Sequence, residues 1–327
     1  MSNYRKRIIL LTNHYSEGPF AIVESELPQG FRLQMLARND AESLLAAIPE
    51  ADYLLASGRV KITAEALSHA PKLKMIQRTG VGLDSLDLDT IRARGIPLYV
   101  NQGVNARSVA EHTLLLILAC LRRLPQIHRN TANGVWKKQA QGVLTSELAG
   151  KTVGLIGMGS IGKIVASLLQ AFQANVVYSK PRRLPEAEEQ ALGITYLPLE
   201  ELAAKADVVS MHCPMTPETA NMIDADFLSR MKPGAIFVNT ARGGLVDMPA
   251  LTQALQSGRL SFAGLDVYDQ EPVSPDSPIF KLENVILTPH IGGITADSFR
   301  RMMHDAMRNI HLFEEGKLEA IESMRYL

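Results

Sequence analysis

The sequence has few cysteines, no excess of either charge and no long hydrophobic run. Only Cys120 and Cys213 carry thiols, and both stand among apolar residues, which favours buried reduced thiols over a disulfide, a nucleophile or a metal pair. No cluster of cysteine and histidine has the spacing of a metal site, so we expect no metal ion. The 34 basic and 34 acidic residues cancel. This balance gives no global field for nucleic acid or an anionic membrane, so neither is an expected partner.

The apolar runs are also too short for membrane or export signals. The longest, 114–121, falls well below the ~20 residues that a membrane helix needs. Near the basic N-terminus, the run 8–11 is too short for a signal peptide. We therefore predict a soluble, cytoplasmic protein in which any anionic ligand is bound by local groups.

A chain of 327 residues with 46% hydrophobic content is long enough for two cores. Runs rich in β-formers alternate with helical stretches, which predicts parallel sheets with crossover helices. In the first third we predict strands at 7–12, 51–57, 73–79 and 96–101, with helices at 63–69 and 86–94. A long helical run, 104–123, and a polar stretch with little periodicity, 129–146, follow.

A second alternating series begins at Lys151. We predict strands at 152–156, 175–179, 207–213, 235–240, 262–268 and 285–288. These runs are nearly all apolar, as expected for strands covered on both faces. The helix predicted at 161–173 presents one apolar stripe, and a last helix is predicted at 295–315. The fold class predicted is α/β, with two doubly wound parallel-sheet domains.

The segment KTVGLIGMGSIG places Gly157, Gly159 and Gly162 directly after a predicted strand and at the start of a predicted helix. In a dinucleotide-binding fingerprint the first glycine permits the tight turn, the second lets the backbone approach a pyrophosphate, and the third lets the helix sit close to the strand. The phosphates then lie on free N–H groups at the positive end of the helix. Glycines also serve ordinary turns, but the strand before and the helix after them favour dinucleotide binding.

The end of the next predicted strand bears on the choice of cofactor. An acidic residue there would bind the adenosine ribose and repel a 2′-phosphate. Here Ser179 occupies that position, and Lys180, Arg182 and Arg183 follow. A hydroxyl beside cations suits a 2′-phosphate, so we predict NADP as the preferred cofactor, with NAD as the alternative. The other interpretation is a solvated basic loop.

Three late segments carry polar groups where strands should end. They contribute Arg242, then Asp266 and Glu271, and then His290. A guanidinium matches the adjacent carboxylate and ketone oxygens of a 2-oxo acid, and a histidine can give and retake a proton near neutral pH. A carboxylate on the far ring nitrogen would fix its tautomer. Arg242, His290 and Glu271 fit these roles, although each taken alone could equally be structural.

At these residues the chain resembles the family of D-isomer-specific 2-hydroxyacid dehydrogenases. The resemblance spans essentially the whole chain and rests on six motifs in order. These are RTGVGLDSLDL (78–88), VNARSVAEH (104–112), GLIGMGSIGK (154–163), NTARGGLVD (239–247), AGLDVYDQEP (263–272) and LTPHIGG (287–293). It implies a flavodoxin-like substrate domain, residues 1–102 and 290–327, and a Rossmann cofactor domain, residues 103–289.

The resemblance also implies roles for individual residues. Arg242, Glu271 and His290 form the catalytic trio, and the substrate is held by Arg242, by Ser57 and by backbone N–H groups around Gly80, Val81 and Gly82, where a glycine-rich turn can bind an anion. Ser160 and Ile161 line the pyrophosphate, Cys213, Pro214 and Thr219 border the adenosine, and Asp266 contacts the nicotinamide carboxamide. The remaining cofactor contacts implied are Val104, Thr240, Ala241, Arg242, His290 and Gly292.

Members of the family pair as dimers, so the resemblance implies a homodimer. The contact implied is formed by residues 114–118 and 129–146. Trp136 would either reach the partner's cleft or anchor the interface. Many members have an acidic residue at the position of Ser179. In this respect the chain resembles more closely the glyoxylate/hydroxypyruvate reductases that use NADPH. The activity implied is reduction of a small 2-oxo acid. The alternatives are a redox-sensing scaffold resembling the family's corepressors and phosphite oxidation; formate-type members carry glutamine where Glu271 stands.

Overall fold

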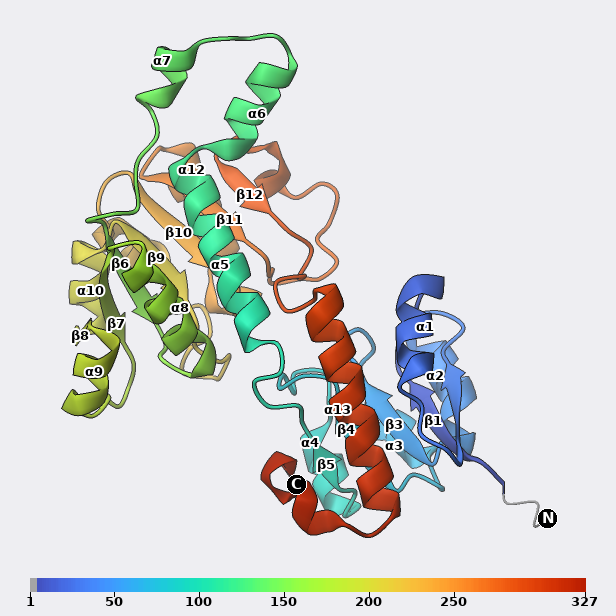
Figure 1. Ribbon diagram of the computed structural model, residues 1–327. Coiled ribbons are helices and arrows are strands. Elements are labelled where there is room, and N and C mark those ends of the chain that lie inside the picture. The colour runs from blue at the N-terminus through green and yellow to red at the C-terminus, as the bar shows by residue number, and fades with distance from the viewer. Residues whose placement is uncertain (1–4) are drawn as a thin grey trace. The chain divides into compact units, whose positions relative to one another are not determined.

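The structure is a computed structural model that describes residues 5–327 and divides them into two units (Figure 1). The first unit combines the chain up to Asn105 with Ala296–Leu327, and the second is Ala106–Thr295. All named strand pairs in both units are parallel. The prediction of two doubly wound parallel sheets is therefore confirmed.

The first unit is built on a five-stranded sheet in the order β2-β1-β3-β4-β5, the flavodoxin-like order. Its strands are β1 (Arg7–Leu11), β2 (Phe31–Met35), β3 (Tyr53–Ala56), β4 (Met75–Arg78) and β5 (Leu98–Tyr99). Its helices are α1 (Glu17–Ser25), α2 (Ala41–Ala47), α3 (Ala64–Ser68), α4 (Leu88–Ala93) and α13 (Ala296–Glu314). Side chains of α2, α3 and α4 form one core layer, and those of α1 and α13 contribute to the other. The sheet is thus buried on both faces.

The second unit is built on a seven-stranded sheet in the order β12-β11-β10-β9-β6-β7-β8. Its strands are β6 (Thr152–Ile156), β7 (Asn175–Ser179), β8 (Ile194–Tyr196), β9 (Val208–Met211), β10 (Ala235–Asn239), β11 (Leu260–Leu265) and β12 (Val285–Leu287). Its helices are α5 (Ala106–Leu121), α6 (Leu124–Ala132), α7 (Lys138–Gly142), α8 (Ser160–Ala171), α9 (Glu186–Leu192), α10 (Leu199–Lys205), α11 (Ala225–Arg230) and α12 (Met248–Gln256). The order reverses between β6 and β9, where doubly wound sheets place their ligand crevice at the carboxyl ends of the strands.

Local chemistry sets several boundaries close to those predicted. Thr63 and Asp87 cap α3 and α4 with side-chain oxygens that accept from Ala66 N–H and Thr90 N–H. The apolar stripe of α8 packs Val165, Ala166 and Leu169 into the core. These helices fall within one or two residues of the ranges that periodicity indicates.

Other elements escaped the sequence prediction. The edge strand β2 buries only its first residue, Phe31, so its pattern is weak. The stretch 129–146 contains the end of α6 and all of α7, which form an arm at one end of α5 (Figure 1). Neither helix buries any residue, so no apolar stripe marks them in the sequence. The elements α1, α2 and β8 were also missed, and no range was predicted for the crossover helices α9, α10, α11 and α12.

Candidate active site

The turn after β6 is shaped by close packing. Gly157 has φ +100°, and a Cβ there would lie 2.5 Å from the carbonyl carbon of His212. A Cβ at Gly162 would lie 2.6 Å from the carbonyl oxygen of Gly157. The turn therefore accepts only glycine at both positions, which brings the start of α8 against the end of β6.

The middle glycine is not required by the protein's own packing. A Cβ at Gly159 would meet no atom within 4 Å, and Gly159 is the N-cap of α8 without a side-chain hydrogen bond to the helix. Ser160, Ile161 and Gly162 begin this helix, so their N–H groups face the space beside Gly159. An uncapped helix start beside an open backbone position fits a bound pyrophosphate.

The end of β7 and the loop after it hold four polar residues, Ser179, Lys180, Arg182 and Arg183, which differ in their hydrogen-bond partners. Arg183 donates from Nε and Nη2 to the two oxygens of Glu189 at 2.8 and 2.6 Å, and Tyr178 donates to Glu189 at 2.5 Å. The structure therefore gives Arg183 a structural partner rather than leaving it for a ligand. Ser179 is buried. For Lys180 and Arg182, no hydrogen bond or ion pair with any of residues 5–327 is found.

The residues expected on the adenosine side lie on the loop that follows β9. Thr219 Oγ1 accepts from Thr216 N–H at 2.8 Å and donates to the carbonyl of Pro214 at 2.9 Å, which closes the loop. Burial raises the pKa of the Cys213 thiol to about 11 and that of the Cys120 thiol to about 12. Both cysteines are free and protonated near neutral pH, so neither is a nucleophile.

The loop after β10 presents Arg242. Asn239 shapes it by accepting from Ala241 N–H at 3.0 Å and donating to the carbonyl of Arg242 at 2.8 Å. Thr240 is buried and shares a hydrogen bond of 2.8 Å with Thr113 of α5. A Cβ at Gly243 would lie 1.8 Å from the carbonyl carbon of Tyr268. This glycine therefore lets the Arg242 loop pack directly on the loop after β11.

The loops after β11 and β12 bring Glu271 and His290 together. Glu271 Oε2 lies 2.6 Å from His290 Nδ1, and Glu271 Oε1 accepts from Tyr268 N–H at 3.0 Å. Burial alone would raise the pKa of Glu271, but the hydrogen bond and charge of His290, with the Tyr268 N–H, lower it below its usual value. Glu271 is thus an anion that accepts a hydrogen bond from Nδ1–H, which leaves Nε2 of His290 for proton transfer.

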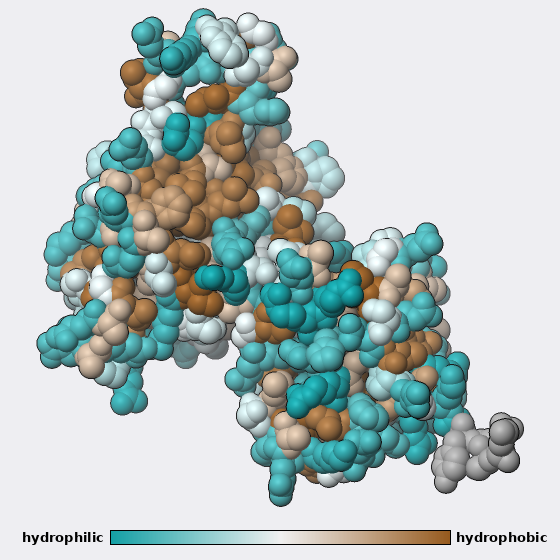
Figure 2. All heavy atoms as spheres, in the orientation of Figure 1, coloured by the Kyte–Doolittle hydropathy of each residue, from teal (hydrophilic) through white to brown (hydrophobic). Residues whose placement is uncertain are grey.

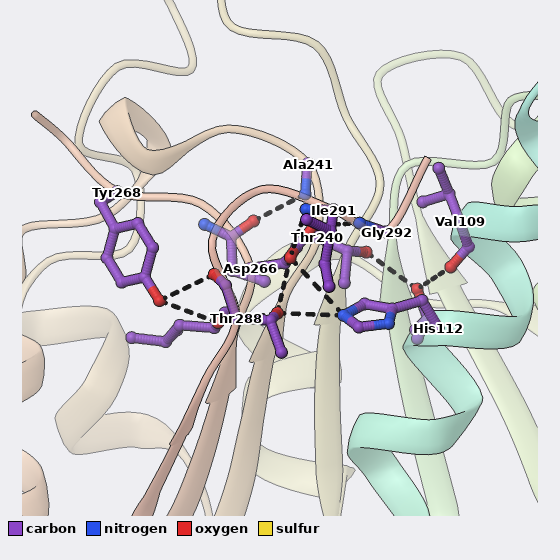
Figure 3. A network of polar contacts seen from close by, with 12 residues as sticks. Val109, His112, Thr240, Ala241, Asp266, Tyr268, Thr288, Ile291 and Gly292 are labelled. Carbon is purple, nitrogen blue, oxygen red and sulfur yellow. Dashed lines mark hydrogen bonds and ion pairs between the residues drawn. The ribbon is translucent and has the colours of Figure 1, made fainter. Parts of the chain in front are cut away.

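Asp266, which follows β11 directly, is 2% exposed and lies within a polar network (Figure 3). Its Oδ1 accepts from Thr288 at 2.5 Å and from Ile291 N–H at 2.9 Å, and its Oδ2 accepts from Gly292 N–H at 2.8 Å. Burial opposes its charge, but these donors and His112 lower the pKa of Asp266. The structure therefore gives Asp266 an anchoring role, and its contact with a nicotinamide stays a prediction.

Apart from Arg242, the expected substrate residues lie in the first unit. Ser57 follows β3, donates to the carbonyl of Thr12 at 3.1 Å and is partly exposed. The 80–82 turn follows β4, and its N–H groups find no acceptor within residues 5–327. Arg78 holds this turn by donating to the carbonyls of Gly82 at 2.7 Å and Ala56 at 3.1 Å. Val104 packs at the edge of the core of this unit.

Sequence reasoning missed Arg78 and His112 as parts of these sites. Arg78 is a buried arginine, 7% exposed, whose only signal was its place two residues before the glycine-rich turn. His112 lies on α5 with its Nε2 3.0 Å from Thr288 Oγ1. It stands within VNARSVAEH, and nothing in that motif indicated a contact with a loop so far along the chain.

Comparison with known families shows the class of the protein. Residues 114–292 match the NAD-binding domain of the D-isomer specific 2-hydroxyacid dehydrogenases. The protein belongs to the D-isomer-specific 2-hydroxyacid dehydrogenase family. The fold, the glycine turn and the motifs around Arg242, Glu271 and His290 are those expected for such a member.

Several curated relatives and solved structures are similar to this chain over most of its length. A hydroxypyruvate reductase of Thermotoga maritima is 38% identical over 265 residues, 80% of this chain and 85% of the relative. A D-3-phosphoglycerate dehydrogenase of Mycobacterium tuberculosis is 44% identical over 278 residues, 85% of this chain but only 52% of that relative, so this chain matches about half of it. The crystal structure of D-lactate dehydrogenase from Aquifex aeolicus, complexed with NAD and lactic acid, matches with a TM-score of 0.86 and 31% identity over 98% of both chains.

Among residues 5–327, no helix has the length and apolar character needed to cross a membrane.

Proposed function

We propose that the protein transfers a hydride between a nicotinamide dinucleotide and a small 2-oxo or D-2-hydroxy acid, as a reductase of the glyoxylate/hydroxypyruvate type. The observation that carries this proposal is the 2.6 Å contact between His290 Nδ1 and Glu271 Oε2. It lies in the same unit and at the same carboxyl edge of the sheet as Arg242 and the turn at Gly157–Gly162. A histidine oriented by a carboxylate beside a cofactor turn is an acid–base catalyst for alcohol–ketone interconversion.

Each side chain then has one role. The guanidinium of Arg242 pairs with the carboxylate and carbonyl oxygens of the acid. When bound, the nicotinamide supplies or accepts the hydride. In reduction, His290 Nε2 gives its proton to the substrate oxygen as the C=O double bond becomes a single bond, and in oxidation Nε2 takes the hydroxyl proton. Glu271 accepts the hydrogen bond from Nδ1–H throughout and stabilises the imidazolium.

The N–H groups of Gly80, Val81 and Gly82, with Ser57, bind the substrate carboxylate in this proposal. Support comes from their lack of acceptors within residues 5–327 and from Arg78, which fixes the turn through the carbonyl of Gly82. Successive free backbone N–H groups form an anion-binding concavity. In this scheme the first unit provides the substrate domain and the second unit the cofactor domain.

The cofactor residues follow from the same elements. Gly157, Gly159, Ser160, Ile161 and Gly162 hold the pyrophosphate in the proposal. Cys213, Pro214 and Thr219 border the adenosine, and Val104, Thr240, Ala241, Asp266 and Gly292 complete the contacts.

NADPH is the proposed cofactor. Ser179 offers a hydroxyl where an acid would repel a 2′-phosphate, and Lys180 and Arg182 have no partner among the described residues. The experiment is a comparison of NADPH with NADH. We expect a higher kcat/KM with NADPH than with NADH. In a Lys180→Ala/Arg182→Ala variant we expect this preference for NADPH to fall. Arg183→Ala should instead reduce stability, because it removes the partner of buried Glu189. Preference for NADH in the unmodified protein contradicts this assignment.

The proposed assembly is a homodimer formed through the α6–α7 arm. This arm and the adjoining face of α5 expose apolar side chains, which Figure 2 shows gathered in this part of the second unit. They are Leu115 (54% exposed), Leu124 (52%), Trp136 (82%), Val143 (79%) and Leu144 (55%). Apolar surface of this kind marks an interaction site. Light scattering should give a dimer mass, and Trp136→Ala with Val143→Asp should give a monomer; a wild-type monomer contradicts the assembly.

The activity itself is tested by a substrate panel. Oxidation of NADPH and NADH is followed by absorbance with glyoxylate, hydroxypyruvate, pyruvate and phosphohydroxypyruvate, and phosphite is offered with the oxidised cofactors. We expect turnover with a small 2-oxo acid, and a loss of about 10²- to 10⁴-fold in His290→Ala with cofactor binding retained. Exposed His69, whose ring has hydrogen bonds within residues 5–327 only to Glu65 and Ser68 of α3, supplies the control His69→Ala. Absence of turnover with every 2-oxo acid contradicts the proposed function.

A further inference from the structure

The backbone at His290 adopts a conformation that the surrounding structure must enforce. Its φ is +55°, in the left-handed region that residues with a β-carbon rarely adopt. Such a conformation persists only where neighbouring contacts hold it in place. Because this backbone directs the imidazole toward Glu271, whatever holds the turn also sets the position of the acid–base group.

The contacts that hold the turn come from Asp266. Both of its carboxylate oxygens accept backbone N–H groups of the two residues after His290, at 2.9 Å from Ile291 and 2.8 Å from Gly292. A Cβ at Gly292 would lie 2.9 Å from Asp266 Oδ2 and 3.1 Å from His112 Cδ2, so both side chains would have to shift to admit it. Asp266 therefore acts as a clamp, and the ring of His112 packs against the same turn (Figure 3).

The clamp is itself oriented from α5. Thr288 donates its single hydroxyl hydrogen to Asp266 Oδ1 at 2.5 Å, so its oxygen must accept from His112 Nε2, 3.0 Å away. The same Nε2 lies 3.5 Å from Asp266 Oδ1. His112 is only 13% exposed, and Asp266 2%. The order of donation is thus His112 to Thr288 to Asp266, which requires a hydrogen on Nε2 of His112.

We propose that His112 is a positioning residue for His290. Its Nε2–H orients Thr288 and Asp266, Asp266 clamps Ile291 N–H and Gly292 N–H, and this clamp keeps His290 in the left-handed conformation that brings Nδ1 to Glu271. His112 does not touch the reacting atoms. The proposal rests on the proposed function, because His290 is there assigned the acid–base role.

Two substitutions separate the donor of His112 from its bulk. His112→Gln keeps an N–H near the position of Nε2, and His112→Leu keeps apolar volume but has no donor. His69→Leu is the matched control, because His69 is exposed and its ring has hydrogen bonds within residues 5–327 only to Ser68 Oγ and the carbonyl of Glu65. The first measurement is hydrogen exchange of the Ile291 and Gly292 amides in the ligand-free protein, which needs neither cofactor nor turnover.

In His112→Leu we expect these two amides to exchange about tenfold faster or more, with exchange in β6 and β9 unchanged. We expect kcat to fall about tenfold or more, because small displacements of a catalytic group cost that much, while KM for the dinucleotide stays within twofold. His112→Gln should restore both properties to near wild type. His69→Leu should change neither.

Each other outcome overturns the proposal. Wild-type exchange at Ile291 and Gly292 in His112→Leu shows that the clamp does not depend on His112. Equal defects in His112→Gln and His112→Leu show that shape rather than hydrogen bonding matters. Faster exchange with unchanged kcat shows that the clamp does not position His290. Failure of the proposed function is distinguished separately, since wild type would then lack turnover while the exchange measurement would still report on the clamp.

Discussion

Replacing Glu271 with glutamine tests the central contact most directly. The carboxylate accepts from Tyr268 N–H through Oε1 and from His290 Nδ1 through Oε2. If the amide oxygen keeps the Tyr268 bond, the NH₂ group faces Nδ1 and forces the neutral ring to carry its hydrogen on Nε2. That tautomer cannot act as a base, and the imidazolium form loses its anionic partner. If the amide turns around, its NH₂ group faces the Tyr268 N–H instead.

Both orientations of the amide remove a charge-assisted hydrogen bond. Both also place the NH₂ group against another hydrogen-bond donor, at His290 or at Tyr268. Such a bond contributes about 1.5–3 kcal/mol, and an unsatisfied donor costs about 1–3 kcal/mol. We therefore expect Glu271→Gln to raise the activation barrier by about 2–4 kcal/mol, which lowers kcat about 30- to 1000-fold. Single-turnover kinetics measure the hydride step, and fluorescence titration measures dinucleotide binding, which should stay within threefold.

The control is Glu283→Gln, an 80% exposed glutamate of the same unit that lies 3.5 Å from Arg129. Surface pairs of this kind contribute little, so its rate should equal that of wild type. A folded Glu271→Gln protein with a rate within threefold of wild type would refute the role given to the His290–Glu271 pair.

Three further predictions concern stability and reactivity. Gly243→Ala places a Cβ 1.8 Å from the Tyr268 carbonyl carbon and should lower the free energy of unfolding by about 2 kcal/mol or more, whereas Gly18→Ala, with no atom within 4 Å, should not; calorimetry of the pair decides. Glu314 accepts from Tyr53, Arg7 and Lys74, which together outweigh the effect of burial and lower its pKa to about 2. Its folded-state pKa is depressed, so its contribution to the free energy of unfolding is present above pH 4.5 and is lost as pH falls through about 2. In denaturant titrations, Glu314→Gln should lower the free energy of unfolding by about 1–3 kcal/mol at pH 7 and by little at low pH. An equal loss at both pH values would contradict this. Cys120 and Cys213 should react with a thiol reagent far more slowly in the folded than in the unfolded protein at pH 8, since burial raises both pKa values; equal rates would refute it.

Much of the architecture was predictable because the central strands are buried on both faces. The strands β6, β9 and β10 consist almost wholly of apolar residues, and the stripe on α8 has helical spacing. The elements that were missed lack this signal. Helices α6 and α7 bury no residue, and β2 is an edge strand, so their periodicity does not report a core.

Within the site, the sequence indicated one pair of partners and missed the others. It predicted Glu271 as the carboxylate on the far ring nitrogen of His290, and the structure has these two side chains 2.6 Å apart. Arg183 illustrates the limit, because a basic run in the sequence suggested phosphate binding and the structure pairs Arg183 with Glu189. The contact of His112 with Thr288 spans 176 positions, and short-range patterns carry no information about such a pair.

The division of the chain has a consequence for how this protein can be altered. Residues 106–295 form one uninterrupted segment that carries the glycine turn, Arg242, Glu271 and His290, while α13 completes the other unit. A chimera that exchanges the flanking segments together, keeping 106–295 intact, would replace the whole of the proposed substrate domain and leave the proposed cofactor domain unchanged. Exchange of the leading segment alone would instead pair α13 with a sheet it did not evolve to cover.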